Sequence, residues 1–233
     1  MAAPQNLPKI LIVTTSHASL GDTEKTTGLW VEELTTPYYA FLDAGASVTV
    51  ASMQGGPVPI DPGSQQADGE NPASVERFQA DEAAQQAIAN TPALEDVDAS
   101  AYDAVFLPGG HGTMWDLPTS DRLADIVSST LAEGRVVAAV CHGPAGLVAA
   151  RTAAGEPVVK GRKVATFTDA EESAVGLTET VPFLLETKLR ELGAEIHKAG
   201  EFEPFAITDG NLITGQNPMS SELVADKVLS ALS

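Results

Sequence analysis

The chain has 233 residues, of which 43% are hydrophobic and 19% are charged. This composition is typical of a globular protein with a packed core. Thirteen Lys and Arg residues against 32 Asp and Glu residues give a formal net charge of -19. Such a charge repels phosphate backbones and anionic lipids, so it argues against nucleic-acid and membrane partners.

The cysteine count and the apolar runs bear on the cellular compartment. A single cysteine cannot form an intramolecular disulfide, so nothing indicates an oxidising environment. The first apolar run, ILIV, is too short for a secretory signal, and no run reaches the roughly 18 residues of a membrane helix. We therefore expect a cytoplasmic protein.

The first third of the chain predicts a strand, a helix and a second strand. The β-branched run at 9–15 is typical of a strand buried on both faces. Apolar residues recur at helical intervals over 28–44, with Pro37 as an expected kink or break. The next strand is predicted at 47–52, and a loop rich in Gly and Pro follows to about residue 74.

The rest of the chain continues to alternate strands with helices. The predicted elements are, in order, a strand within 102–110, a helix at 120–133, strands at 136–140 and 163–168, a helix at 181–192, a short strand pair within 205–215, and a last helix from Pro218. This alternation predicts one α/β domain over residues 1–233, with a doubly wound, mostly parallel sheet and helices on both faces. Its functional site would lie at the carboxyl ends of the strands.

The only cysteine lies in the stretch VVAAVCHGPAGL, between a buried strand and a Gly-Pro turn. A lone buried cysteine is often just a small apolar side chain. Here, however, a strand, a sharp turn and a predicted helix match a nucleophile elbow, with Ala139 and Gly143 as small neighbours of Cys141. A helix N-terminus would also favour thiolate, so we expect an exposed thiol of low pKa that oxidises readily.

Five motifs together point to a known family. The chain contains GLWVEELTTPYYAFLDAGASVTVAS, PIDP at 59–62, LPGGHGTMWDL, AVCHGPAGL and ITGQNP, in that order. In these motifs the chain resembles the PfpI superfamily, which has the flavodoxin-like fold of class I glutamine amidotransferases. The most similar branch contains heat-inducible chaperones and glyoxalase III enzymes.

The resemblance implies a nucleophile and a neighbouring acid. Cys141 would be the nucleophile and His142 the histidine beside it. Glu33 matches the acid whose carboxyl approaches the sulfur, where a largely protonated carboxyl can exchange a proton with a bound intermediate. Adjacent helical residues point about 100° apart, so only one of Glu32 and Glu33 can face the sulfur, and the motif selects Glu33.

The third member of the implied catalytic triad is an acid beyond the strand that follows the elbow. In FTDAEE the best match is Glu172, with Asp169 and Glu171 as alternatives. The acid would orient the imidazole of His142 and stabilise its cationic form.

The PGGHG segment is expected to bind the substrate. The amides of Gly109 and Gly110, with that of His142, would form an oxyanion hole. His111 would either line the pocket or cap the loop. No spaced cluster of His, Cys and Asp indicates zinc, so we expect no metal.

The resemblance implies glutathione-independent glyoxalase activity without a cofactor. The substrate would be a small dicarbonyl, methylglyoxal or glyoxal, with repair of glycated protein groups drawing on the same thiol chemistry. Relatives often form homodimers. The alternatives are a stress chaperone that does not need Cys141 and a glutamine amidotransferase-like hydrolase or peptidase. Amidotransferases need a distant His-x-Glu motif, which the later part of the chain lacks.

Overall fold

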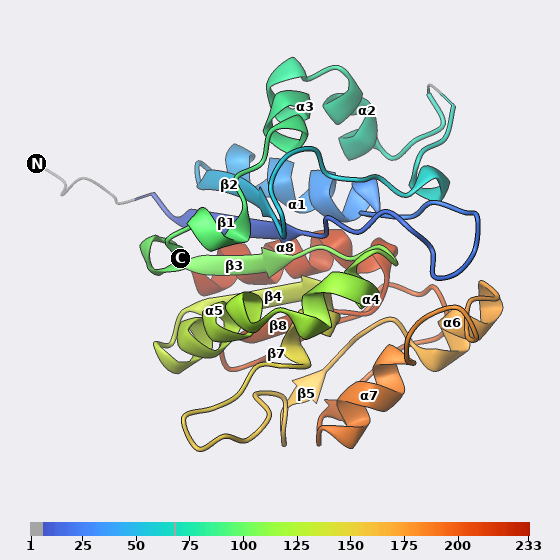
Figure 1. Cartoon of the computed structure of the whole chain (residues 1–233). Helices are drawn as coiled ribbons and strands as arrows, with labels where there is room; N and C mark the ends of the chain where they lie inside the picture. The colour runs from blue at the N-terminus through green and yellow to red at the C-terminus, as the bar shows by residue number, and fades with distance from the viewer. Residues whose placement is uncertain (1–6, 68) are drawn as a thin grey trace, which may run out of the picture.

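The computed structural model describes residues 7–67 and 69–233 (Figure 1). Residues 1–6 and 68 lie outside this description, so the predicted single domain over residues 1–233 stays a prediction.

A central sheet organises the described part of the chain. Its six strands lie in the order β2-β1-β3-β4-β8-β7, and every neighbouring pair is parallel except β7 with β8. The strands are β1 Lys9–Thr14, β2 Ser47–Ser52, β3 Ala104–Leu107, β4 Val136–Val140, β7 Ala206–Asp209 and β8 Leu212–Gly215. This arrangement confirms the predicted α/β fold with a mostly parallel sheet.

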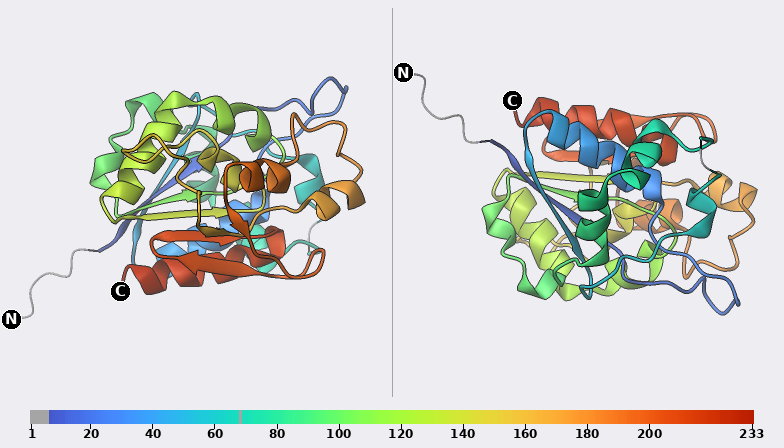
Figure 2. Two further views of the ribbon diagram at one scale, coloured as in Figure 1. Left: turned by 90° about the horizontal axis from the view of Figure 1, so that it is seen from below. Right: turned by 90° about the horizontal axis from the view of Figure 1, so that it is seen from above.

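Helices cover both faces of the sheet (Figure 2). Helices α1 (Val31–Asp43) and α8 (Ser221–Ala231) lie on one face, and α5 (Asp121–Ala132) lies on the other. The remaining helices are α2 Ala73–Gln79, α3 Glu82–Ala89, α4 Thr113–Asp116, α6 Asp169–Ala174 and α7 Leu185–Glu191. None of the helices that the structure describes combines the length and the apolar character needed to cross a bilayer.

Alternating side chains of the strands build a core on each face. In β1, Ile10 and Ile12 pack on the side of α1 and α8, whereas Leu11 and Val13 pack on the side of α5. All four side chains are fully buried. Burying such a side chain contributes roughly 1.5–3 kcal/mol, which explains why the central strands read as continuous apolar runs.

Two details of the first helix differ from the prediction: the residue at which it begins and the break at Pro37. Helix α1 begins at Val31 rather than at residue 28, and it continues through Pro37 without a break. Proline removes one backbone donor inside the helix. Burial of Leu34 and Phe41 in the core on this face outweighs that loss.

The predicted strand at 163–168 is also shorter than expected. Only β5 (Lys163–Val164) is a strand, and it pairs with β6 (Glu195–Ile196) in a separate two-stranded parallel sheet. The residues after β5 instead run beside the end of β4, where the Phe167 N–H donates to the carbonyl of Cys141 (2.8 Å). They therefore belong to the site described next.

Candidate active site

The predicted site residues gather at the carboxyl ends of the parallel strands, as the fold class predicts. Cys141 follows β4 directly, and Gly109 lies just beyond β3. Glu33 reaches this edge from the first turn of α1, and Glu172 reaches it from α6. Four segments far apart in the sequence thus meet at one place.

The backbone at Cys141 has the strained conformation of a nucleophile elbow. Its φ of 59° lies in the left-handed region, which is uncommon for a residue other than glycine. Its N–H donates to the carbonyl of Gly215 (3.0 Å), and its carbonyl accepts from the Phe167 N–H and from Thr166 Oγ1. These bonds from two other segments hold a conformation that costs about 1–3 kcal/mol.

Gly143 allows the turn to close against the neighbouring strand. A Cβ at this position would lie 2.0 Å from the carbonyl oxygen of Leu107, so only glycine fits. The segment after the turn is a short 3-10 helix, Gly143–Leu147. The helix expected after the turn is present only as this short 3-10 segment, which offers little dipole to stabilise a thiolate.

The Cys141 thiol is buried, contrary to the expectation of an exposed thiol of low pKa. Only 3% of the residue is accessible to solvent. Burial raises its pKa well above the ordinary value, and the neighbouring Glu33 raises it further, whereas a backbone hydrogen bond from Gly110 acts in the opposite direction. The free protein therefore holds a protonated thiol, which needs a base to become a nucleophile.

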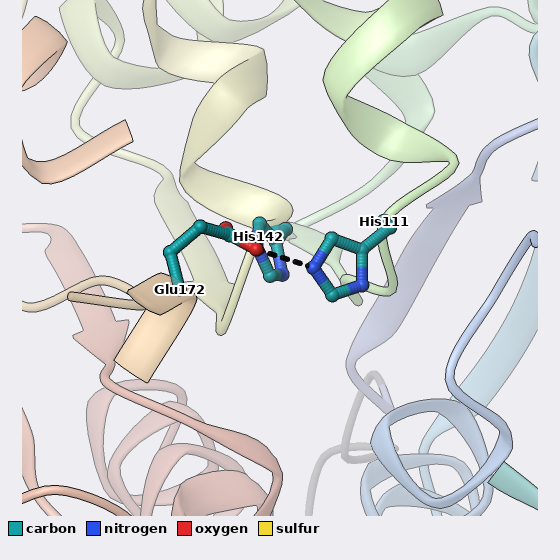
Figure 3. A group of neighbouring side chains, drawn as sticks. All are labelled: His111, His142 and Glu172. Atoms are coloured by element: carbon teal, nitrogen blue, oxygen red, sulfur yellow. Dashed lines mark hydrogen bonds and ion pairs between the residues drawn. The ribbon is translucent and has the colours of Figure 1, made fainter. Parts of the chain in front are cut away.

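His142 is placed to be that base. Its Nδ1 lies 3.2 Å from the sulfur of Cys141. On its other side, Nε2 lies 2.8 Å from Oε2 of Glu172, which Figure 3 draws beside it. A carboxylate only accepts hydrogen bonds, so Nε2 carries the proton and Nδ1 presents its lone pair to the thiol. Burial and the neighbouring His111 lower the pKa of His142 from its ordinary 6.5, which keeps the ring neutral.

Glu172 accepts hydrogen bonds from two imidazoles. Its other oxygen, Oε1, lies 2.8 Å from Nε2 of His111, and the ring centres of His111 and His142 are 4.2 Å apart (Figure 3). Burial alone would raise the pKa of Glu172, but the bonds to His111 and His142 outweigh it and lower the pKa to about 2. Glu172 is therefore ionised at neutral pH.

The alternative acids in FTDAEE make other contacts. Asp169 accepts from the side chain and backbone of Thr187. Glu171 is fully buried and accepts hydrogen bonds from the Thr168 N–H and hydroxyl, the Phe202 N–H, and the side-chain amides of Gln216 and Asn217. Of the three candidate acids, only Glu172 contacts His142.

His111, His142 and Glu172 could also hold a metal ion, because their ligand atoms lie within 4.8 Å of one another. In the arrangement described, both Nε2 atoms instead serve as donors to the carboxylate. A metal would have to replace both hydrogen bonds. The expectation of no metal stays a prediction.

Glu33 is a buried carboxyl beside the thiol. Its Oε2 accepts from the Gly109 N–H (2.7 Å), and its Oε1 has no hydrogen-bond partner of ordinary geometry among the described residues. Burial raises the pKa of Glu33 to about 8, although interactions with Cys141 and Gly109 oppose the rise. The carboxyl is thus mostly protonated at pH 7, with Oε1 free to carry the proton. Glu32 is only partly buried.

The oxyanion prediction needs one correction. The Gly109 N–H is already bonded to Glu33, so it is not a free donor for a substrate oxygen. Gly110 has a φ of 98°, and a Cβ there would lie 2.4 Å from the backbone nitrogen of Trp30. Both glycines are therefore needed for close approach of the backbone.

An open cavity of about 540 Å³ leads to the site. Its lining includes His111, Trp30 and the exposed Lys25. A larger cavity of about 700 Å³ lies beside the end of α5, but none of the predicted site residues lines it. Of the two cavities, only the smaller is lined by a predicted site residue, His111, so it is the route to the site.

Phe167 is a site residue that sequence reasoning missed. Its ring packs on His142, with ring centres 4.4 Å apart, and its N–H holds the carbonyl of Cys141. Its position just before TDAEE gave no signal beyond an apolar residue in an expected strand.

The chain is similar to several known proteins over nearly its full length. A model of the DJ-1/PfpI family matches residues 27–231. Glyoxalase 3 of Candida albicans is 32% identical over 96% of this chain and 98% of its own length, and a glutathione-independent glyoxalase of Saccharomyces cerevisiae is 33% identical with the same coverage.

Solved structures are similar over the whole fold. The crystal structure of glyoxalase III from Candida albicans has a TM-score of 0.87 and 31% identity, covering 96% of this chain and 97% of its own. The Rapid Encystment Protein of Francisella tularensis has a TM-score of 0.93 and 37% identity, covering 97% of this chain and 100% of its own.

Proposed function

We propose that the chain, which belongs to the DJ-1/PfpI family, is a glutathione-independent glyoxalase that converts methylglyoxal or glyoxal into the corresponding 2-hydroxy acid. The observation that carries this proposal is the hydrogen-bonded series Cys141, His142 and Glu172 beside the buried carboxyl of Glu33. The relatives named as glyoxalases, similar over nearly the full chain, support it.

The reaction begins with the thiol of Cys141. His142 Nδ1 accepts the thiol proton while the sulfur attacks the aldehyde carbon, and Glu172 stabilises the imidazolium that forms. The aldehyde oxygen takes a proton from Glu33, which is protonated because its pKa is about 8. The product of this step is a hemithioacetal.

Isomerisation then converts the hemithioacetal into a thioester. The hydrogen on the former aldehyde carbon passes as a proton to the neighbouring ketone carbon, and the hydroxyl proton passes to the ketone oxygen, so no external oxidant is needed. Glu33, ionised after the first step, can carry the carbon-bound proton, and His142, protonated after the first step, can give a proton to the ketone oxygen and take one back from the hydroxyl group. Water finally cleaves the thioester, releases the 2-hydroxy acid and restores the thiol.

A single assay tests the proposal. Purified protein should consume methylglyoxal without glutathione and release a 2-hydroxy acid in equal amount. Cys141→Ser should lose nearly all of this activity, because a serine hydroxyl is far harder to ionise than a thiol. The conservative control, Glu32→Gln, should stay close to wild type. Comparable activity of wild type and Cys141→Ser would exclude the mechanism.

The same pair of proteins separates the enzyme from a stress chaperone. Suppression of aggregation of an unfolded client depends on exposed apolar surface and not on the thiol. A chaperone would protect the client equally with wild type and Cys141→Ser, while neither consumed methylglyoxal.

We also propose a homodimer, a cytoplasmic location and, as a second use of the thiol, repair of glycated protein groups. The single cysteine, which cannot form an intramolecular disulfide, supports the location. Light scattering on the purified protein tests the dimer. Release of glycating groups from a methylglyoxal-treated peptide, with Cys141→Ser as control, tests the repair.

A further inference from the structure

We propose that His111 is a second catalytic base of this site and that its Nδ1 activates the water that hydrolyses the thioester on Cys141. This inference rests on the proposed glyoxalase function, because it assigns a residue to the last step of that reaction. It starts from the finding that Glu172 binds two imidazoles and not one.

The two histidines face different sides of the site. His142 is 1% exposed, and its Nδ1 is directed at the sulfur. His111 comes from the loop after β3, and Figure 3 shows its second ring nitrogen pointing away from Glu172. The two rings therefore share one carboxylate but offer their free nitrogens to different partners.

The free nitrogen of His111 is open to the route of the substrate. Among the described residues, Nδ1 of His111 has no hydrogen-bond partner, and it is not fully enclosed by protein. The residue lines the cavity of about 540 Å³. A water molecule entering through this cavity would meet that nitrogen before it could reach the buried Nδ1 of His142.

Glu172 fixes the proton of His111 and can stabilise its imidazolium, as a catalytic base requires. The carboxylate fixes the proton of His111 on Nε2, so Nδ1 carries the lone pair. When Nδ1 takes a proton, the resulting imidazolium lies 2.8 Å from an ionised carboxylate whose pKa is held at about 2. The same carboxylate can therefore support one histidine during attack by the thiol and the other during hydrolysis.

The hydrolytic step balances without a co-reactant. The water oxygen bonds to the thioester carbon as one water proton passes to His111 Nδ1. The tetrahedral intermediate then collapses, the carbon–sulfur bond breaks, and its electron pair goes to the sulfur of Cys141. The second water proton ends on the sulfur, and His111 returns its proton to solvent, leaving the 2-hydroxy acid as its anion.

The test uses His111→Gln. The glutamine side-chain amide can still donate to Glu172, but it cannot accept the water proton. We expect the first turnover of methylglyoxal to remain close to wild type while steady-state kcat falls about 10²- to 10⁴-fold. Intact mass spectrometry should show one substrate bound to Cys141, in a form that hydroxylamine removes as a thioester. His197→Gln, which alters a histidine outside the site, is the control and should behave as wild type.

Each outcome discriminates. Wild-type turnover by His111→Gln would overturn the proposal and leave His111 only lining the pocket. Loss of the first turnover without an adduct would also overturn it, since His111 would then act before the thioester forms. Inactivity of the wild type would refute the glyoxalase function itself. If His111→Gln does not fold, His111→Ala with added imidazole replaces it in the test. Imidazole should then restore kcat. A folded His111→Ala that imidazole does not restore would overturn the role of His111 as the base.

Discussion

Replacing Glu33 with Gln should make the protein more stable at alkaline pH. The carboxyl of Glu33 is fully buried, and burial raises its pKa from 4.5 to about 8. A glutamine has the same shape, can accept from the Gly109 N–H, and carries no charge at any pH. Glu33→Gln therefore removes the titration while retaining the packing.

The size of the effect follows from the two pKa values. Below pH 4.5 the carboxyl is protonated in both the folded and the unfolded chain. Between pH 4.5 and about 8 the unfolded chain has lost this proton and the folded chain still holds it, so the free energy of unfolding falls by about 1.4 kcal/mol per pH unit. The loss reaches about 5 kcal/mol near pH 8 and then levels off.

Urea unfolding of wild type and Glu33→Gln from pH 5 to pH 9 measures this loss. Between pH 5 and about pH 8, the free energy of unfolding of Glu33→Gln should rise relative to that of wild type by about 1.4 kcal/mol per pH unit. Comparing the two cancels other titrating groups, and Glu32→Gln, at a partly buried neighbour, should give a shallower change. A difference that stays constant with pH would refute the reasoning, because Glu33 would then be ionised in the folded protein.

Four further predictions follow from the same geometry. Cys141 should react slowly with a thiol reagent in the folded protein and at once in urea, because it is 3% exposed; equal absorbance traces would contradict its burial. Gly143→Ala should lower the free energy of unfolding by about 1–3 kcal/mol or more, measured in urea, because its Cβ would meet a backbone oxygen at 2.0 Å. Glu171→Ala should lower the free energy of unfolding by about 1–3 kcal/mol or more, because it leaves buried donors unpaired, and a change below about 1 kcal/mol would argue against that network. Methylglyoxal turnover should survive treatment with EDTA, whereas a loss restored by zinc would show that the site holds a metal.

The strands of the central sheet could be predicted because burial on both faces leaves a plain signal. Continuous apolar runs mark β1 and β4, and Cys141 follows directly where β4 ends. The elbow could also be predicted, because a cysteine followed by His-Gly-Pro directly after a buried strand matches the pattern of a nucleophile elbow.

The elements that depend on packing could not be predicted. Helix α3 buries only Ala84 and Ile88, which is too short a pattern to separate from a loop. Residues 165–168 look like a strand by composition, but their backbone groups bond to the carbonyl of Cys141 and to the side chain of Thr214 in β8, and they do not pair with the backbone of another strand. Local propensity carries no information about such distant partners.

The family motifs predicted the positions of the site residues and a largely protonated Glu33, but not the physical cause of the two protonation states. Glu33 and Glu172 are both buried acids in one site, yet one holds its proton to about pH 8 and the other has a pKa of about 2. The Gly109 N–H and the Cys141 thiol only partly oppose the effect of burial on Glu33, so burial dominates. Glu172 has an imidazole donor on each oxygen, so hydrogen bonding dominates.

This contrast assigns the chemistry of the two acids. A carboxyl that keeps its proton at neutral pH can donate it to the aldehyde oxygen, and a carboxylate that stays ionised can stabilise an imidazolium but cannot act as an acid. The contrast arises from the second histidine, His111, which lies 61 positions from Glu172 in the sequence and 2.8 Å from it in the fold. Without that donor the burial of Glu172 would be opposed by His142 alone, and its pKa would lie closer to that of Glu33. His111, which the sequence predicted either to line the pocket or to cap the loop, therefore helps to keep the two carboxyl groups in different protonation states.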